Sequence, residues 1–127
     1  MDDEEFLREL MEWQLSEMGY HAHTAREGEE ALALCARCLE QGTPLRAAIL
    51  DLTVPGGMGG KEVAARLKTR QPGLPLFASS GYSDDPVMAE PCAFGFTDAL
   101  RKPYKGAELA ARLERHLGAG KPGDPPG

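Results

Sequence analysis

The sequence predicts a single α/β domain built on a doubly wound parallel sheet. Short apolar stretches alternate with longer stretches of helical periodicity, and this alternation implies right-handed crossovers between parallel strands. The run Ala47–Leu50 has no polar alternation, as expected of a strand that is covered on both faces. With 127 residues and 42% hydrophobic content, the chain has the size of one domain with one core.

The first half of the chain predicts two helices and two strands. A first helix ends at Gly19, and a short strand is expected over residues 20–25. A second helix runs from Glu29 to about Gln41, where Gly42 stops it. The buried strand that ends at Asp51 comes next. The apolar face of the first helix consists of Phe6, Leu7, Leu10, Met11, Leu15 and Met18.

The second half predicts three more helices and two more strands. A third helix follows a glycine-rich loop, and residues 74–78 form an apolar strand. Residues 83–86 start a helix with a capping side chain and an early proline, and Pro91 should shorten that helix. Residues 97–102 form a last strand, and a closing helix carries one apolar face. The apolar residues of these helices are Val63, Ala64, Leu67, Leu109, Leu113 and Leu117.

Composition excludes several classes of function. Lys plus Arg number 14 against 20 Asp plus Glu, which gives a net charge of −6 without a basic cluster. Direct binding to nucleic acid is therefore not expected. No stretch has the length of a membrane span, and the acidic start is unlike a secretory signal, so no membrane association and a cytoplasmic location are expected.

Two pairs of potential metal ligands have simpler explanations. The sequence has three cysteines, an odd number that does not indicate a disulfide framework. Cys35 and Cys38 form a C-x-x-C pair without a second pair, and helix packing is the expectation for them. His21 and His23 share one face of the expected strand and could share a metal, but solvated histidines are the simpler interpretation.

Four polar elements fall at the carboxyl ends of the strands in this fold, where ligands of open α/β sheets gather. They are Asp2-Asp3, Asp51, Ser79-Ser80 and Lys102-Pro103. Clustered carboxylates with open positions for water and phosphate favour Mg²⁺. A carboxylate there can attack a phosphoryl group and form an aspartyl phosphate. An ammonium and a hydroxyl would then stabilise the phosphoryl oxygens.

Each element alone has a simpler explanation. Asp51 could be a turn or N-cap aspartate, Asp2-Asp3 a solvated acidic terminus, Ser80 part of a helix-entry turn, and Lys102 a surface charge. Their occurrence together, in this order, favours a functional site.

Together these segments resemble the receiver domain of bacterial two-component signalling, from Met1 to about Leu117. The matching segments are Asp2–Glu5, Ile49–Gly60, Ser79–Met88 and Lys102–Tyr104. The Gly-Gly-Met-Gly-Gly loop and the Ser-Ser-Gly-Tyr segment are most similar to receivers at the C-terminus of hybrid sensor histidine kinases. The resemblance implies a flavodoxin-like receiver fold over residues 1–118. The Pro/Gly-rich composition of residues 119–127 predicts a disordered tail, because such a segment cannot bury apolar surface.

The resemblance also implies the roles of the acidic residues. Asp51 would be the phosphoacceptor. Asp3 would ligate Mg²⁺ directly, and Asp2 would support the ion mainly through water. The backbone carbonyl of Thr53 would be a further ligand.

The remaining roles fall to a hydroxyl and a lysine. Ser80 would be the switch hydroxyl, because it directly precedes Gly81 where the family places a small residue. Ser79 is the rival for that role. Lys102 would be the charge partner of the phosphoryl group, and Pro103 fits the cis peptide bond that the family has after its lysine.

Two features depart from the family. The apolar strand that precedes the acidic pair is absent, since only Met1 stands before it, and in the family's strand order 2-1-3-4-5 that strand is central. An internal methionine start, a shortened chain or a strand supplied by another chain would each explain this. Ala99 stands where many receivers have an aromatic residue, and together with Pro91 it favours a relay element over a transcriptional switch.

The sequence therefore predicts a phosphoacceptor module rather than an enzyme. A sensor histidine kinase or a histidine phosphotransfer protein would donate the phosphoryl group to Asp51 with Mg²⁺. A haloacid-dehalogenase-like phosphohydrolase is a competing interpretation, but such enzymes place a second aspartate at the position of Thr53. A truncated or degenerate receiver that binds proteins without being phosphorylated is the other alternative.

Overall fold

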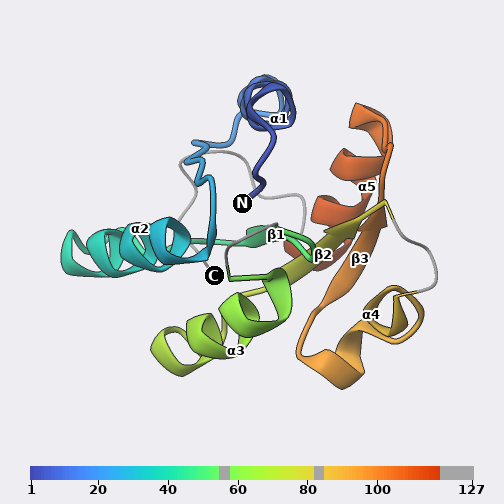
Figure 1. Cartoon of the computed structure of the whole chain (residues 1–127). Helices are drawn as coiled ribbons and strands as arrows, with labels where there is room; N and C mark the ends of the chain where they lie inside the picture. Colours follow the sequence, from blue (N-terminus) through green and yellow to red (C-terminus); the bar gives the residue numbers. More distant parts are fainter. Residues whose placement is uncertain (55–57, 82–84, 118–127) are drawn as a thin grey trace.

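The structure is a computed structural model of the whole chain, and it describes residues 1–54, 58–81 and 85–117. Three parallel strands form the sheet in the order β1-β2-β3. They are β1 (Ala48–Asp51), β2 (Leu76–Ser80) and β3 (Asp98–Arg101). Figure 1 shows helices on both sides of this sheet, which confirms the predicted doubly wound α/β fold.

Five α-helices and one short 3₁₀ helix complete the described part of the chain. Positive φ angles at Gly19 and Gly42 end the first two helices, as the sequence predicted. Pro91 separates α4 from the 3₁₀ helix, which confirms that it shortens the fourth helix. The helices are α1 (Glu5–Glu17), α2 (Gly28–Glu40), α3 (Gly60–Arg70), α4 (Pro86–Ala89), η1 (Pro91–Phe94) and α5 (Gly106–Leu117).

Two apolar cores lie on opposite faces of the sheet. The larger core joins α2, α3 and α4 to one face, with Leu50, Leu76 and Ala78 at its centre. The second core joins α5 to the other face through Phe77 and Leu100, and α1 packs against it only with partly buried side chains. Alternate residues of β2 therefore point to different cores, as expected for a strand that is buried on both faces.

The expected strand over residues 20–25 is absent, so that prediction was wrong. The segment is extended in Figure 1 but belongs to no strand. A strand needs a neighbour that accepts and donates backbone hydrogen bonds, and the bond from the Asp2 amide to the Ala25 carbonyl, at 3.1 Å, is the contact that joins residues 20–25 to the sheet side. The other expected strands are present, although β2 runs two residues further than predicted and includes both serines.

Several predictions concern residues outside the described part of the chain. These are the tip of the glycine-rich loop (55–57), the start of the fourth helix (82–84) and the tail (118–127). Within the described residues, Asp85 caps α4 by accepting a hydrogen bond from the Val87 amide. Cys35 and Cys38 are buried against the core from α2, as the packing interpretation predicted. No helix among the described residues combines the length and hydrophobicity needed to cross a membrane.

Candidate functional site

The ends of the strands bring three carboxylates together. Asp51 ends β1, and Asp2 and Asp3 approach it from the start of the chain. One carboxylate oxygen from each residue lies within 4.8 Å of the others. Charged oxygens this close repel one another unless a cation lies between or beside them. The predicted acidic cluster is therefore present in the fold.

Lys102 follows β3 and supplies a cation to this cluster. Its Nζ lies 2.7 Å from Asp2 Oδ2 and 3.4 Å from Asp51 Oδ2. Burial lowers the pKa of Lys102, but the hydrogen bond to Asp2 and the charge of Asp51 outweigh burial and raise it overall. Lys102 is therefore held as an ammonium between two carboxylates.

Asp51 is the most enclosed of the three carboxylates, with only 4% of its surface exposed. Burial raises the pKa of Asp51, although Lys102 and the Thr53 amide oppose the rise. The Thr53 amide donates to Asp51 Oδ1 at 3.2 Å. This leaves Oδ2 facing Lys102, which orients the carboxylate for reaction at an oxygen beside a cation.

Two glycines let the following helix close over the end of β1. A Cβ atom on Gly60 would lie 2.7 Å from the Asp51 carbonyl oxygen, and one on Gly59 would lie 3.0 Å from the Leu52 carbonyl oxygen. A side chain at Gly60 would collide with the backbone of β1, and one at Gly59 would fit only if that backbone shifted slightly. The glycine-rich loop named by the sequence therefore has a steric role beside Asp51.

The start of the chain is held by a few backbone contacts. The Met1 amino group donates to the Ile49 carbonyl at 2.6 Å, and the Asp51 amide donates to the Met1 carbonyl at 2.9 Å. Arg8 adds a hydrogen bond to the Asp2 carbonyl at 3.0 Å. Burial lowers the pKa of the Met1 amino group to about 6. Asp2 is thereby placed beside Lys102, while Asp3 remains exposed.

The two serines of β2 point to opposite faces of the sheet. Ser79 is the register partner of Asp51, whereas Ser80 pairs with Arg101 of β3. Register partners in a parallel sheet share a face and successive residues alternate, so Ser79 shares the face of Asp51. Its hydroxyl is buried beside the Tyr104 side chain, whose pKa it helps to lower against the effect of burial. The sequence could not separate these adjacent serines, because their faces depend on strand register.

Other predicted features are also placed. The Lys102–Pro103 peptide bond is cis, as the resemblance implied. Ala99 is buried in β3 opposite Ala78. Tyr104, Arg8 and the Met1 amino group were not predicted as parts of the site. The only sequence signal for Tyr104 was its place directly after the Lys-Pro pair.

His21 and His23 lie away from this cluster, with stacked rings whose centroids are 5.1 Å apart. Within the described residues they belong to no group of three potential metal ligands. The carboxylate cluster is therefore the candidate metal centre. Its all-oxygen donor set fits a hard divalent cation such as Mg²⁺.

The chain matches the family model of the response regulator receiver domain over residues 1–114. It is 31% identical to the transcriptional regulatory protein AruR of Pseudomonas aeruginosa over 115 residues, which cover 90% of this chain and 46% of AruR. It is also 31% identical to the response regulator MprA of Mycobacterium leprae, with 98% of this chain and 52% of MprA covered. The chain thus spans about half the length of these curated relatives.

Solved structures agree with these matches. The chemotaxis protein CheY4 of Vibrio cholerae superposes with a TM-score of 0.79 at 27% identity, covering 91% of this chain and 93% of that one. The response regulator TrrA of Thermotoga maritima, solved in complex with Mg²⁺–BeF, gives a TM-score of 0.73 at 28% identity, covering 90% and 92%. The matched family, the fold and the acidic cluster agree, and the chain belongs to the family of response regulator receiver domains.

Proposed function

We propose that this chain is a phosphoacceptor in a two-component phosphorelay. A sensor histidine kinase or a histidine phosphotransfer protein would donate the phosphoryl group, and Asp51 would accept it. One observation carries the proposal. Asp51 lies within a cluster of three carboxylates, and Lys102 lies 3.4 Å from its Oδ2. This arrangement combines a nucleophile, a cation and the ligands for a second cation.

The transfer step follows from the position of Asp51. Its Oδ2 attacks the phosphorus, a new O–P bond forms, and the P–N bond to the donor imidazole breaks with its electron pair going to the nitrogen. The transferred group spreads negative charge over its equatorial oxygens. Lys102 neutralises part of that charge from its present position, since its ammonium already faces Oδ2. A chain with this role is a signalling module and not an enzyme acting on a separate substrate.

The residues present fit Mg²⁺. Asp3 and Asp51 would ligate the ion directly, Asp2 would contact it mainly through water, and the Thr53 carbonyl would add a neutral oxygen. The ion would supply positive charge to the phosphoryl oxygens. The exposure of Asp3 supports its role as a direct ligand. Asp2 instead already holds Lys102 at 2.7 Å.

We propose Ser80 as the switch hydroxyl, as the resemblance implies, and Ser79 remains its rival. Ser79 pairs with Asp51 and shares its face of the sheet. Its buried hydroxyl lies beside Tyr104 on that face. Ser80 ends β2, and its carbonyl accepts a hydrogen bond from the Lys102 amide at 2.8 Å, which joins it to the residue beside Asp51.

The setting of the module follows from the resemblance. The Gly-Gly-Met-Gly-Gly and Ser-Ser-Gly-Tyr segments favour a receiver at the C-terminus of a hybrid sensor histidine kinase in the cytoplasm. Ala99 supports a relay role, because its small side chain cannot make the inward aromatic movement that other receivers use to transmit the signal.

The test is binding of Mg²⁺ and beryllofluoride, a phosphoryl analogue, measured by calorimetry. The chain is expected to bind both saturably, and Asp51→Asn is expected to abolish beryllofluoride binding because its amide cannot supply the acceptor oxygen. Glu62→Gln, an exposed change of the same kind on α3, is the matched control and should bind normally. Normal beryllofluoride binding by Asp51→Asn would refute the proposal.

A second candidate is a receiver-like scaffold that no longer accepts phosphate. The observation that favours it is the closer contact of Lys102 with Asp2 (2.7 Å) than with Asp51 (3.4 Å). In this candidate Lys102 is diverted from the phosphoryl position and blocks the metal site. Absence of Mg²⁺ binding by the unmodified chain at millimolar concentration would select this candidate.

A further inference from the structure

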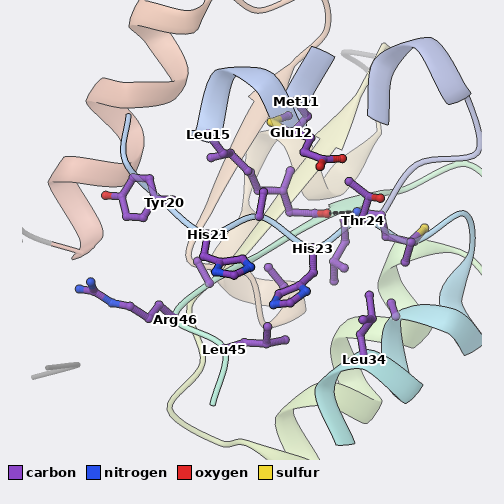
Figure 2. A pocket seen from close by; sticks show the side chains of 18 of the residues that line it. Met11, Glu12, Leu15, Tyr20, His21, His23, Thr24, Leu34, Leu45 and Arg46 are labelled. Carbon is purple, nitrogen blue, oxygen red and sulfur yellow. Dashed lines mark hydrogen bonds between the residues drawn. The ribbon is translucent and has the colours of Figure 1, made fainter. Parts of the chain in front are cut away.

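Helix α1 carries apolar side chains on its outer side as well as on its inner side. Figure 2 shows Met11 and Leu15 on the inner side, from which they pack against the second core. Phe6, Leu10 and Trp13 are exposed instead. Their spacing of four and three residues places them in one stripe along the helix. This α1 stripe contains three of the five large apolar side chains that are exposed among the described residues.

The exposed surface around the α1 stripe is acidic. Arg8 is the only basic residue of the helix, and it is partly buried with a hydrogen bond to the Asp2 carbonyl. A partner of the stripe must therefore offer both apolar surface and positive charge. The exposed acidic residues of the helix are Glu5, Glu9, Glu12 and Glu17.

Helix α3 has the opposite charge, although the chain as a whole carries a net charge of −6. Its single acidic residue, Glu62, pairs with Arg66. Lys68 makes no salt bridge with any described residue, so its charge is available to a partner. The basic residues of α3 are all exposed, and they are Lys61, Arg66, Lys68 and Arg70.

Two of these lysines lie on either side of an exposed aromatic ring. Lys61 Nζ lies 5.4 Å from the centre of the Phe94 ring. The Lys68 side chain runs along the next residue, Gly95, where an added Cβ atom would lie 3.4 Å from Nζ. Phe94 is itself exposed at the end of η1. Lys61, Lys68 and Phe94 therefore form one surface, the α3 patch, with an apolar centre and positive sides.

We propose that the α1 stripe of one copy of this chain docks on the α3 patch of a second copy. The exposed rings of Phe6 and Trp13 would pack against Phe94, and the glutamates of α1 would face the two lysines. Helices α1 and α3 lie on opposite faces of the sheet (Figure 1), so a copy cannot cover its own patch. The inference goes beyond the phosphoacceptor role, because neither surface includes a residue of the carboxylate cluster.

The spacing of the charges supports this match. Glu5 and Glu12 are seven residues apart on α1, and Lys61 and Lys68 are seven residues apart on α3. Seven residues are about two helical turns, or about 10 Å, so each pair lies on one side of its helix with a similar separation. Two ion pairs can therefore form together when the helices lie side by side. A contact between two α1 helices would bring acidic residues together, which disfavours that symmetric arrangement.

The geometry of the contact predicts how the chain associates. Because the two surfaces differ, each copy in a pair keeps one surface free, and association continues as an open chain or closes into a ring. The area that two helices bury is small compared with a standard interface of about 1,600 Å². Association is therefore expected to be weak, with a dissociation constant on the order of 0.1 mM.

The test is sedimentation equilibrium of the whole chain, with a reductant present because Cys92 on η1 is exposed. The average mass should at least double between about 0.01 and about 1 mM. Two variants each reverse the charge of one surface, and each should keep the mass of a single chain. An equimolar mixture of the two should recover association, because a reversed α1 then meets a reversed α3. The variants are Glu5→Lys with Glu12→Lys, and Lys61→Glu with Lys68→Glu.

The matched control reverses two exposed glutamates of α2, Glu29→Lys with Glu40→Lys, and changes the net charge as much as the α1 variant does. It should associate as the unmodified chain does. Trp13→Ala removes only an exposed ring and should weaken association about tenfold. Circular dichroism checks that each variant is folded.

Several results would overturn the proposal. One is an unmodified chain that stays monomeric at about 1 mM. Equal loss of association in the α2 control would assign the effect to net charge alone. Unchanged association in Trp13→Ala, association of either reversed variant on its own, or a monomeric mixture of the two folded variants would each show that the stripe does not dock on the patch.

Discussion

The residues on the two sides of the candidate site are held in place by different numbers of contacts. On one side, Ser79 lies in β2 and Lys102 directly follows β3. These two strands are paired along their length and buried between two cores. On the other side, Asp2 and Asp3 depend on a few hydrogen bonds from Met1, Asp2 and Arg8. Ser79 and Lys102 are thus held by paired, buried strands, while Asp2 and Asp3, two of the proposed metal ligands, are held by a few contacts.

The difference shows what a sheet contributes to a site. A carboxylate at the end of a paired strand is held in position by the backbone hydrogen bonds of the sheet and by packing on both faces. Helix α1 follows the acidic pair and has no fully buried residue, while Phe6 is 72% exposed. The contrast between the two sides can be tested by substitution.

The largest expected difference concerns stability. Phe77→Ala removes a fully buried ring from β2 and should lower the free energy of unfolding by about 3–5 kcal/mol. Met11→Ala on α1 should cost only about 1 kcal/mol, because its side chain is only partly buried. Urea unfolding followed by circular dichroism measures both. Equal costs would remove the contrast between the two sides.

The next effect concerns the cation of the site. Lys102→Ala should weaken beryllofluoride binding about 100-fold, since one preorganised charge beside the phosphoryl oxygens is lost. Lys105→Ala, an exposed lysine three residues further on, is the control and should bind as the unmodified chain does. A comparable loss in both variants would show that losing any positive charge weakens binding, and that the position of Lys102 is not what matters.

A smaller effect is expected on the weakly held side. Asp3→Asn should weaken Mg²⁺ binding about tenfold, because a direct carboxylate ligand becomes a neutral amide. Glu9→Gln, an exposed change on α1, should leave the affinity unchanged. Calorimetric titration with MgCl₂ separates the two. Unaltered affinity in Asp3→Asn would place the ion elsewhere.

The smallest effect concerns Asp98 at the opposite end of β3, where a carboxylate has complete partners. Arg112 and His116 contact it at 2.8 and 2.9 Å. Burial raises the pKa of Asp98, but the His116 hydrogen bond leads the contributions that lower it overall. A lowered folded pKa means that the unfolded state binds the proton more readily as the pH falls.

The stabilisation from Asp98 is therefore present above its unfolded pKa of about 3.9 and is lost as the pH falls through the lower folded value. Asp98→Asn should remove this part of the acid dependence, an effect below about 1 kcal/mol. Urea unfolding between pH 2 and pH 6 measures it. An unchanged acid limb in the variant would show that Asp98 does not contribute.

Much of this arrangement was predictable because it depends on local signals. Gly19, Gly42 and Pro91 marked the ends of helices through their own backbone preferences, and the apolar run before Asp51 marked a strand buried on both faces. The strand predicted over residues 20–25 was wrong. These residues have a sequence pattern typical of a strand, but they do not pair with a neighbouring strand. Propensity alone cannot supply a hydrogen-bond partner.

Other features of the site depend on long-range geometry that no sequence pattern encodes. Ser79 and Ser80 differ only in the face they occupy, which the register of β1 against β2 decides. The contact of Lys102 with Asp2 joins residues 100 positions apart. The missing neighbour of β1 was expected from the resemblance, because only Met1 stands before the acidic pair.

The position of Trp13 has a practical consequence for spectroscopy. It is the only tryptophan of the chain, and it lies on α1 with 61% of its surface exposed. Its emission therefore reports on α1 and carries little information on the buried strands, whose state is better followed through backbone signals. The chain thus contains a natural optical probe for the side of the molecule that is least tightly packed.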